Sequence, residues 1–568
     1  MAKSVDEKGE IADLVLKSLK PKKLKISRED IIGKIEIPPN SEMGDYAFPC
    51  FSLASAMKEN PAEIALEIRG EMGSKTGIFR DVQTKGPYVN FFVNRKELTA
   101  GIISEILEEK EKFGSSQIGK GKTVLVEFSS PNIAKPFGIG HLRSTIIGNS
   151  LSQISEFCGF KTVRMNYLGD WGTQFGKLIA GYRHFGNGDK LKKNPIKHLL
   201  EVYVKINSSE EYEEESRDWF RKLEQGDKES LELWKKFREL SLEEFEKIYG
   251  ELGIKFDVFS GESMYNGEMK EVLGNLKSKK LVKKDKGAEI VDLEKYGLGI
   301  ALITKSDGST LYMTRDLAAA ISRKEKYNFD YMIYEVGQEQ KLHFAQVFKI
   351  LELMGYKWAG SCTHVEHGLY LGKDGKKFAT RKGKTVFMED IIRETKGLAL
   401  EEIKKRNHGA EEPELDRRAM KVAIASIFYG DLKNNRKSDM VFDLKKFTSF
   451  EGDTGPYIQY SYARASSILR KAKKSPDSKP GSLNEKEIEL IKKLGEFPEI
   501  VIKSYREFSP SYIANYAYRL SQLFNEFYHQ HPVIGTKEEP FRLALVESFR
   551  QVIKNAFGLL GIDVLEEM

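Results

Sequence analysis

Cysteine is scarce in this sequence. Three of the 568 residues are cysteines, Cys50, Cys158 and Cys362, and no two of them form a C-x-x-C pair. Zinc clusters and disulfide frameworks need grouped cysteines, so the sequence predicts neither of them. A reducing cytoplasm is the simplest expected location.

Long apolar runs are also absent. No stretch approaches the roughly 18 apolar residues that a membrane-spanning helix needs. The first 20 residues mix acids and lysines with scattered apolar side chains, unlike the apolar segment of a signal peptide. We therefore expect no membrane partner.

Neither sign of charge dominates. The formal net charge is +7, with 31% charged and 40% hydrophobic residues. This composition is typical of a soluble protein with an ample core, and it permits an RNA partner without demonstrating one. A chain of this length predicts two to four folding units.

A strand, a loop and a helix are predicted between residues 124 and 157. Val124 to Phe128 is a β-branched apolar run, and apolar residues return at helical spacing from Ile146 onward. Small residues and Lys135 occupy the loop, which leads to His141 at the helix start. Helix N-termini suit phosphate, because they offer free amide donors and partial positive charge. The spacing matches neither a P-loop nor G-x-G-x-x-G, so neither P-loop nucleotidases nor dehydrogenases are indicated.

The same stretch carries a family resemblance. PFGIGHL, from Pro136 to Leu142, resembles the HIGH signature of class I aminoacyl-tRNA synthetases, and the wider string SSPNIAKPF.IGHLRSTIIG resembles the arginyl-tRNA synthetase form. One departure is Gly138, where the family normally has histidine. The resemblance implies an ATP site at Pro136, Gly138, Gly140 and His141, with His141 and Lys135 in catalytic roles.

The segment after this helix extends the pattern to a parallel sheet. Lys161 to Leu168 reads as a second strand, which gives the βαβ order of a doubly wound sheet. Ligands bind such sheets at the carboxyl ends of the strands. Asp170, Trp171 and Gly172 follow the second strand, so we expect them to line the same crevice.

A second group of polar residues lies near residue 316. We expect a hairpin with a turn at Ser306 to Gly308, a strand ending near Tyr312 and a helix beginning near Asp316. Asp316 would serve equally well as a helix N-cap, and Tyr312 as a half-buried strand aromatic. The strand after this helix ends in polar residues, among them Gln340. A carboxylate there could pair with both arms of a planar guanidinium.

These residues also match the arginyl-tRNA synthetase pattern, in which Tyr312 stands four before Asp316 and Gln340 lies in G.EQ..HF. The resemblance implies that Asp316 and Tyr312 take the guanidinium and that Asn132 and Gln340 take the α-amino end. Spacing alone permits arginine but does not assign it. The full set of arginine-binding residues that we predict is Glu127, Ser130, Asn132, His141, Glu262, Tyr312, Asp316 and Gln340.

The stretch from Leu371 to Lys384 is rich in lysine, arginine and glycine. A solvated loop or general RNA attraction is the default explanation for such a run. It also resembles the KMSKS loop, in the variant that lacks the second lysine and for which Lys135 compensates. That resemblance implies catalytic roles for Lys377 and Arg381 and ATP contacts from Lys377, Thr380 and Lys382. Mg²⁺ would arrive with ATP, and we predict no dedicated metal site.

Two flanking regions resemble the tRNA-binding parts of the family. GPYVNFFVN and GDTGPYIQY resemble strings of the N-terminal additional domain and of the helical anticodon-binding domain. Hydrophobic packing explains the aromatics equally well, so RNA contact and packing both stay open. The tRNA-binding residues that we predict are Tyr88, Asn90, Tyr457, Tyr460, Arg464 and Lys471.

We predict a multidomain protein. It would comprise an N-terminal α+β tRNA-binding domain (1–115), a Rossmann-like catalytic domain with a doubly wound parallel sheet (116–396) and a C-terminal all-α anticodon-binding domain (397–568). A helical insertion is expected at about 185–253. The resemblance implies ATP-dependent ligation of L-arginine to its tRNA by a monomer. The alternative is a tRNA-binding paralogue with weak or no activity because of Gly138.

Overall fold

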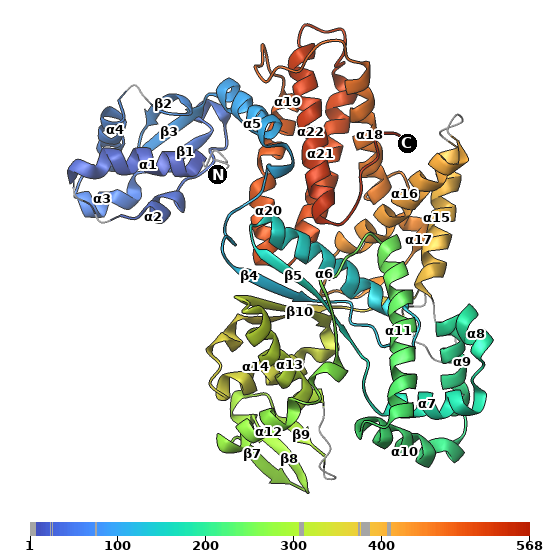
Figure 1. Cartoon of the computed structure of the whole chain (residues 1–568). Coiled ribbons are helices and arrows are strands. Elements are labelled where there is room, and N and C mark those ends of the chain that lie inside the picture. Colours follow the sequence, from blue (N-terminus) through green and yellow to red (C-terminus); the bar gives the residue numbers. More distant parts are fainter. Residues whose placement is uncertain are drawn as a thin grey trace. The chain divides into compact units, whose positions relative to one another are not determined.

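A computed structural model describes residues 7–22, 24, 26–73, 76–305, 312–372, 375, 387–405 and 411–568 (Figure 1). The chain forms two compact units. The first comprises Met1–Gly114, Arg464–Pro498 and Leu520–Val552, and the second comprises Ser115–Ala463, Glu499–Arg519 and Ile553–Met568. No helix within the described ranges is both long and apolar enough to cross a bilayer.

The first unit contains the predicted N-terminal α+β fold. Its antiparallel sheet has the order β1-β3-β2, formed by β1 (Tyr46–Pro49), β2 (Phe79–Lys85) and β3 (Tyr88–Val93). The core includes Ile11, Phe48 and Phe91. The helices of this region are α1 (Glu7–Leu19), α2 (Arg28–Ile32), α3 (Phe51–Met57), α4 (Pro61–Glu71) and α5 (Arg95–Glu109).

The second unit is built on a five-stranded sheet with the order β11-β10-β4-β5-β6, in which every pairing is parallel. Its strands are β4 (Thr123–Glu127), β5 (Lys161–Leu168), β6 (Val258–Gly261), β10 (Tyr331–Gly337) and β11 (Cys362–His367). The chain runs outward from β4 to β6 and then returns to the other side of β4. Such a switch point opens a crevice at the carboxyl ends of β4 and β10. The predicted doubly wound sheet is confirmed.

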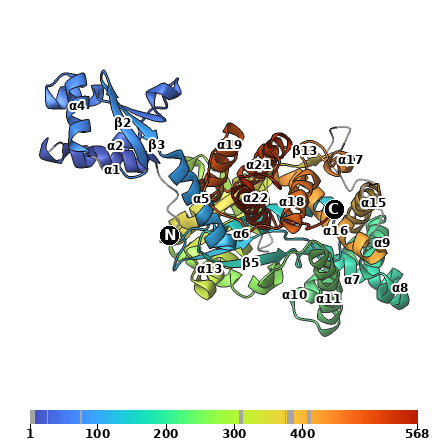
Figure 2. The ribbon, with the colours of Figure 1, turned by 90° about the horizontal axis from the view of Figure 1, so that it is seen from above.

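Helices surround this sheet. Helix α6 (Ile139–Phe157) connects β4 to β5, and α13 (Tyr312–Tyr327) and α14 (Lys341–Leu353) flank β10 in sequence. Helices fill the segment between β5 and β6, in which the insertion is predicted, and they lie together in Figures 1 and 2. These are α7 (Thr173–Phe185), α8 (Gly188–Lys193), α9 (Pro195–Ile206), α10 (Glu213–Glu224) and α11 (Lys228–Glu251).

A separate small antiparallel sheet precedes the expected hairpin turn in the sequence. Strand β9 (Ile300–Thr304) pairs with β8 (Ala288–Asp292), which pairs with β7 (Val282–Asp285), all antiparallel. The proposed turn at 306–308 lies outside the described residues. Residues from Tyr312 onward are helical, so the prediction that Tyr312 ends a strand is wrong. Helix α12 (Met269–Ser278) packs with α13 in one core, where Leu276 and Leu317 are buried.

The C-terminal third is helical, as predicted. Its helices are α15 (Met388–Lys404), α16 (Glu412–Leu432), α17 (Leu444–Phe447), α18 (Gly455–Lys471), α19 (Glu485–Gly495), α20 (Phe497–Arg506), α21 (Ser511–Gln530) and α22 (Glu539–Leu559). The division between the two units falls inside α18, α20, α21 and α22. Strand β12 (Tyr370–Leu371), which follows β11, pairs in parallel with β13 (Met440–Val441), which precedes α17.

Candidate active site

The turn after β4 has an unusual backbone. Ser129 and Ser130 have φ angles of 72° and 46°, in the left-handed region that side chains other than glycine rarely adopt. Such residues cost about 1–3 kcal/mol each and persist only when their surroundings hold them. Here the Ser129 amide donates to Ser144 Oγ over 2.9 Å, and Ser129 Oγ lies 2.7 Å from the Tyr249 hydroxyl. Helices α6 and α11 therefore fix this turn.

The end of β5 fixes the next part of the loop. The Gly169 amide donates to Pro131 O, and the Ile133 amide donates to Gly169 O, over 3.1 and 3.2 Å. A Cβ atom at Gly169 would lie 2.2 Å from Asn132 Oδ1, so a side chain there would displace Asn132. Glycine at position 169 lets Asn132 stand at the carboxyl ends of the two strands.

His141 lies in the first turn of α6. Its Nδ1 accepts a hydrogen bond from the Gly138 amide over 3.3 Å. Burial, together with the charge of nearby Lys135, lowers the pKa of His141 to about 4, so the ring is neutral at pH 7. Because Nδ1 accepts, the single ring proton sits on Nε2. His141 is therefore an uncharged donor.

Gly138 is buried at the start of the same helix. Its φ of −102° suits any residue, so the helix start does not require glycine. Its backbone forms an antiparallel bridge with Phe387, and the Met388 amide donates to Phe137 O over 3.0 Å. Position 138 is thereby tied to the start of α15.

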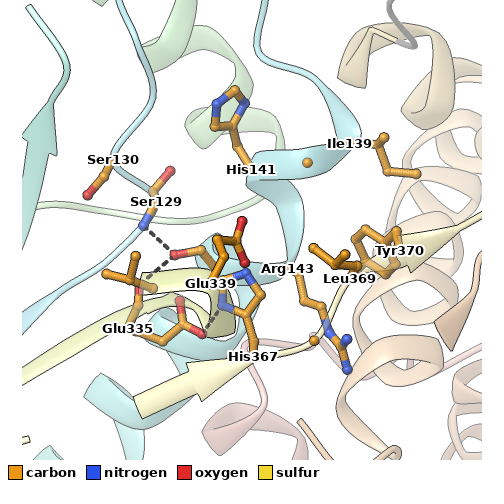
Figure 3. A pocket seen from close by; sticks show the side chains of 15 residues that line it. Ser129, Ser130, Ile139, His141, Arg143, Glu335, Glu339, His367, Leu369 and Tyr370 are labelled. Carbon is orange, nitrogen blue, oxygen red and sulfur yellow. Dashed lines mark hydrogen bonds and ion pairs between the residues drawn. The ribbon is translucent and has the colours of Figure 1, made fainter. Parts of the chain in front are cut away.

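A first pocket, which we call the Gly140 pocket, opens beside this helix start (Figure 3). It has a volume of about 300 Å³ and is lined by Ser129, Ser130, Ile139, Gly140, His141, Arg143, Ser144, Glu335, Val336, Gly337, Glu339, His367, Gly368, Leu369 and Tyr370. Of the predicted ATP residues, Gly140 and His141 line it, whereas Pro136 and Gly138 are buried and do not. A Cβ at Gly140 would meet nothing within 4 Å, so this part of the wall is open.

The remaining predicted catalytic and ATP-binding residues are described only in part. Lys135 is exposed, with its Nζ 5.9 Å from the centre of the Tyr203 ring. Lys377, Thr380, Arg381 and Lys382 lie outside the described residues.

The far wall of the Gly140 pocket carries a buried ion pair. His367 Nδ1 lies 2.8 Å from Glu335 Oε1, and His141 points away from this pair (Figure 3). Burial alone would lower the pKa of His367, but the Glu335 carboxylate outweighs it and the net shift is upward. Below them, Arg143 Nε lies 3.4 Å from Asp431 Oδ2, which ties α6 to α16.

A second pocket, which we call the Asp316 pocket, lies next to the first. It has a volume of about 350 Å³ and is lined by Glu127, Ser130, Asn132, Tyr167, Gly169, Glu262, Tyr312, Asp316, Arg323, Tyr334, Val336, Gln340, His343, Phe344 and Val347. Seven of the eight predicted arginine-binding residues are among them, and the eighth, His141, lines the Gly140 pocket instead. Ser130 and Val336 line both pockets, so the two share a wall.

The Asp316 pocket is acidic. Asp316 Oδ2 lies 2.6 Å from His343 Nε2, and Tyr167 donates to Asp316 Oδ1 over 3.5 Å. Burial raises the pKa of Glu262 to about 7, although Arg315, 3.9 Å away, acts against this shift. Glu127 pairs with Arg323 over 2.5 Å. Three acidic side chains, Glu127, Glu262 and Asp316, line the pocket against one arginine, so its lining suits a cation.

Helix α13 presents two of the predicted residues together. It starts at Tyr312, which is 59% exposed, and Asp316 follows one turn later on the same face. Asp316 lies inside the helix, so the alternative of an N-cap is wrong. Tyr312 therefore lines the pocket from the first turn of a helix and not from the end of the expected strand.

The prediction that Asp170, Trp171 and Gly172 line the crevice is wrong. Asp170, Trp171 and Gly172 line neither pocket. Asp170 is fully buried, accepts from the Ser263 amide over 2.8 Å and pairs with Arg238 over 3.1 Å. It anchors the helical insertion and the turn after β6. Among the lining residues that sequence reasoning missed are Tyr167 and Arg323, and only the seven-residue step from Asp316 to Arg323 could have indicated the latter.

None of the predicted tRNA-binding residues is among those that line the two pockets. In the first unit, Tyr88 is half-buried with its ring centre 5.8 Å from that of Phe51, and Asn90 is only 5% exposed. Arg464 donates to Asn525 over 2.7 Å, and Lys471 is exposed. In the second unit, Tyr457 packs edge-on against Tyr518, and Tyr460 is exposed.

Metal ligands do not gather in the part of the chain that the structure describes. No group of three or more His, Cys, Asp or Glu side chains there could hold an ion.

Comparison with known families gives three matches along the chain. The profile of the class I tRNA synthetase (R) catalytic domain matches residues 102–444, and that of the DALR anticodon binding domain matches residues 458–568. The arginyl tRNA synthetase N terminal domain matches residues 9–93.

Whole-chain relatives agree with these matches. An arginine–tRNA ligase of Clostridium perfringens is 46% identical over 555 residues, covering 95% of this chain and 97% of the relative. That of Clostridium beijerinckii is 44% identical and covers 99% of this chain and 100% of the relative.

Solved structures share the fold. The arginyl-tRNA synthetase of Plasmodium falciparum has a TM-score of 0.79 at 27% identity and covers 99% of both chains. That of Thermus thermophilus has a TM-score of 0.79 at 24% identity, covers 98% of this chain and 99% of that one, and supports the fold alone. The chain belongs to the arginyl-tRNA synthetase family of class I aminoacyl-tRNA synthetases.

Proposed function

We propose that this chain joins L-arginine to its tRNA in two steps that use ATP. One observation carries the proposal: an acidic pocket that suits a cationic side chain shares a wall with a pocket at a helix N-terminus that suits a nucleotide. An amino acid in the first can therefore present its carboxylate to ATP in the second. Arginyl-adenylate forms first, and the terminal ribose hydroxyl of the tRNA then takes the arginyl group.

Arginine lies in the Asp316 pocket. Asp316 and Tyr312 bind the guanidinium, since a carboxylate matches its fork and a neutral analogue would leave Asp316 unpaired. Asn132 and Gln340 hold the α-amino end, with Glu127 and Glu262 assisting. Ser130 stands in the shared wall, where its Oγ is buried and has no hydrogen-bond partner among the described residues, so it is available to the reacting carboxylate.

ATP enters the Gly140 pocket as its Mg²⁺ complex. The arginine carboxylate attacks the α-phosphorus, the bond to pyrophosphate breaks, and negative charge builds on the leaving oxygens. Positioning and preorganised donors lower the barrier of such a transfer. Neutral His141 donates from Nε2, and Lys135, Lys377 and Arg381 supply positive charge. Gly140, Thr380 and Lys382 bind the nucleotide, and Pro136 and Gly138 shape the loop behind it.

The regions outside the catalytic domain bind tRNA. Residues 1–115 act on the tRNA corner through Tyr88 and Asn90, and residues 397–568 bind the anticodon side through Tyr457, Tyr460, Arg464 and Lys471. The catalytic domain spans residues 116–396. The protein works as a cytoplasmic monomer.

The alternative of a tRNA-binding paralogue without activity is not supported, since the relatives that match nearly the whole chain carry the ligase name. Aminoacylation with arginine tests the proposal, and a chain that binds tRNA but yields no charged product would contradict it. Arginine-dependent ATP–pyrophosphate exchange is expected only with tRNA present. Exchange that ignores tRNA would remove that part of the proposal.

A further inference from the structure

The Asp316 pocket contains a guanidinium of the chain itself. Arg323, on α13, is only 2% exposed, and its Nη1 lies 2.5 Å from Glu127 Oε2 on β4. Three tyrosine rings surround it, with its Cζ 4.6 Å from the ring centre of Tyr167, 5.7 Å from Tyr265 and 5.9 Å from Tyr334. A site that suits a cationic amino acid thus already holds one buried cation.

Packing alone does not explain an arginine at this position. A buried ion pair seldom stabilises a fold more than apolar side chains of the same volume, because both charges lose their hydration. Arg323 Nε and Nη2 have no hydrogen-bond partner within the described residues, which adds to that cost. An apolar residue among three tyrosines would avoid the cost. The charge of Arg323 therefore points to a role at the site.

Arg323 is connected to both ends of the pocket. It contacts Glu127 directly, and its guanidinium lies over the Tyr167 ring, whose hydroxyl donates to Asp316 Oδ1 over 3.5 Å. Asp316 and Arg323 are seven residues apart on α13, so they project from the same face two turns apart. One helix thus supplies the carboxylate for the substrate side chain and the cation that faces Glu127.

We propose that Arg323 is a positioning residue for the ligation reaction: it keeps Glu127 ionised and directed into the Asp316 pocket, where that carboxylate receives the α-ammonium of the amino acid. This inference rests on the proposed function. Arg323 does not touch the reacting atoms, but it sets the charge of Glu127, which contacts the substrate.

The surroundings of Glu127 support this role. Burial raises the pKa of Glu127 and the net shift is upward; the attraction of Arg323 acts against this shift, and the nearby charge of Asp316 adds to it. Arg323 is thus the group that opposes protonation. The other titratable groups that line the pocket around this pair are Tyr167, Glu262, Asp316, Tyr334 and His343. None of these carries the fixed positive charge that Arg323 provides.

The test compares R323M with the unsubstituted chain in steady-state aminoacylation between pH 6.5 and 8.5. Without Arg323, buried Glu127 binds a proton near neutral pH, as buried carboxyls do. At pH 6.5 we expect the KM for arginine to exceed that of the unsubstituted chain by about 10- to 100-fold, the loss of one charge-assisted hydrogen bond. This ratio should shrink several-fold by pH 8.5, because Glu127 ionises again, and kcat should change little.

R418M is the matched control. Arg418 on α16 is also buried, at 9% exposed, and pairs with Glu414 over 2.6 Å and with Glu567 over 3.0 Å, but it lines neither pocket. Its KM for arginine should equal that of the unsubstituted chain at every pH. E127Q should raise the KM relative to the unsubstituted chain as R323M does at pH 6.5, but this ratio should not change with pH, and R323M should add nothing to E127Q.

A KM ratio for R323M that stays near one, or that is raised equally at all pH values, would overturn the inference. If R323M does not fold, the KM values of E127Q and R323K for arginine test the inference instead. R323K keeps the positive charge and should show a smaller KM ratio than E127Q at pH 6.5, whereas an E127Q chain with an unchanged KM overturns the inference. Failure of the unsubstituted chain to charge tRNA with arginine would instead refute the proposed function.

Discussion

Replacing Asp316 by asparagine removes the charge that we assign to the substrate guanidinium. The carboxylate accepts two contacts in the pocket, from His343 at 2.6 Å and Tyr167 at 3.5 Å, and its side chain is 23% exposed. An amide keeps the size of the side chain but offers one acceptor oxygen and no charge. D316N therefore tests the charge with little change in packing.

The size of the effect follows from the bonds that are lost. Two charge-assisted hydrogen bonds contribute about 3–6 kcal/mol when shielded from water, and partial exposure with a shared oxygen reduces this to about 2–4 kcal/mol. That range corresponds to a fall of about 30- to 1000-fold in kcat/KM for arginine. The guanidinium lies far from the reacting carboxylate along the side chain, so ground and transition states lose binding equally. Most of the change should appear in KM.

The assay is tRNA charging at varied arginine concentration, with thermal unfolding as a check on the fold. D292N is the control, since Asp292 pairs with Lys283 over 2.8 Å on the small antiparallel sheet and lines neither pocket. Its kinetics should match those of the unsubstituted chain. A folded D316N chain with an unchanged KM for arginine would refute the placement of the guanidinium.

Three further predictions concern other parts of the second unit. Burial raises the pKa of Glu262 to about 7, so this carboxyl ionises as the pH rises from 6 to 8 and the KM for arginine should fall over that range. E262Q should flatten this pH profile, and an E262Q profile identical to that of the unsubstituted chain would exclude Glu262 from arginine binding. K135A should lower kcat by about 100-fold with little change in the KM for arginine, as for loss of one transition-state donor, while the exposed Lys192 on α8 gives a control. D431N leaves Arg143 buried without its partner at 3.4 Å, so the free energy of unfolding in urea should fall by about 3–5 kcal/mol, and a fall below about 1 kcal/mol would contradict the pairing.

Strand β4 was predictable because its apolar residues are buried, and the run from Val124 begins one residue after the start of β4. Lys161–Leu168 is observed with the predicted bounds. Such runs carry a strong local signal. The resemblance to the arginyl-tRNA synthetase pattern then supplied the eight arginine-binding candidates, and seven of them line one pocket.

Other features depend on contacts between distant parts of the chain. The residues around Tyr312 have a strand-like composition but begin a helix, whose buried face packs against α12 and α14. Asp170 follows a strand as a ligand-binding residue would, yet Ser263 and Arg238 bury it. Arg323 meets Glu127 only because β4 and α13 come together, so no local pattern could reveal the pair.

The central claim is that the Gly140 and Asp316 pockets form one site for arginine and ATP. A non-hydrolysable analogue of arginyl-adenylate tests it most directly, in competition experiments on the whole chain with its tRNA. We predict that the analogue inhibits competitively against arginine and also against ATP, since it would span the wall formed by Ser130 and Val336. Competition against only one of the two substrates would contradict the claim.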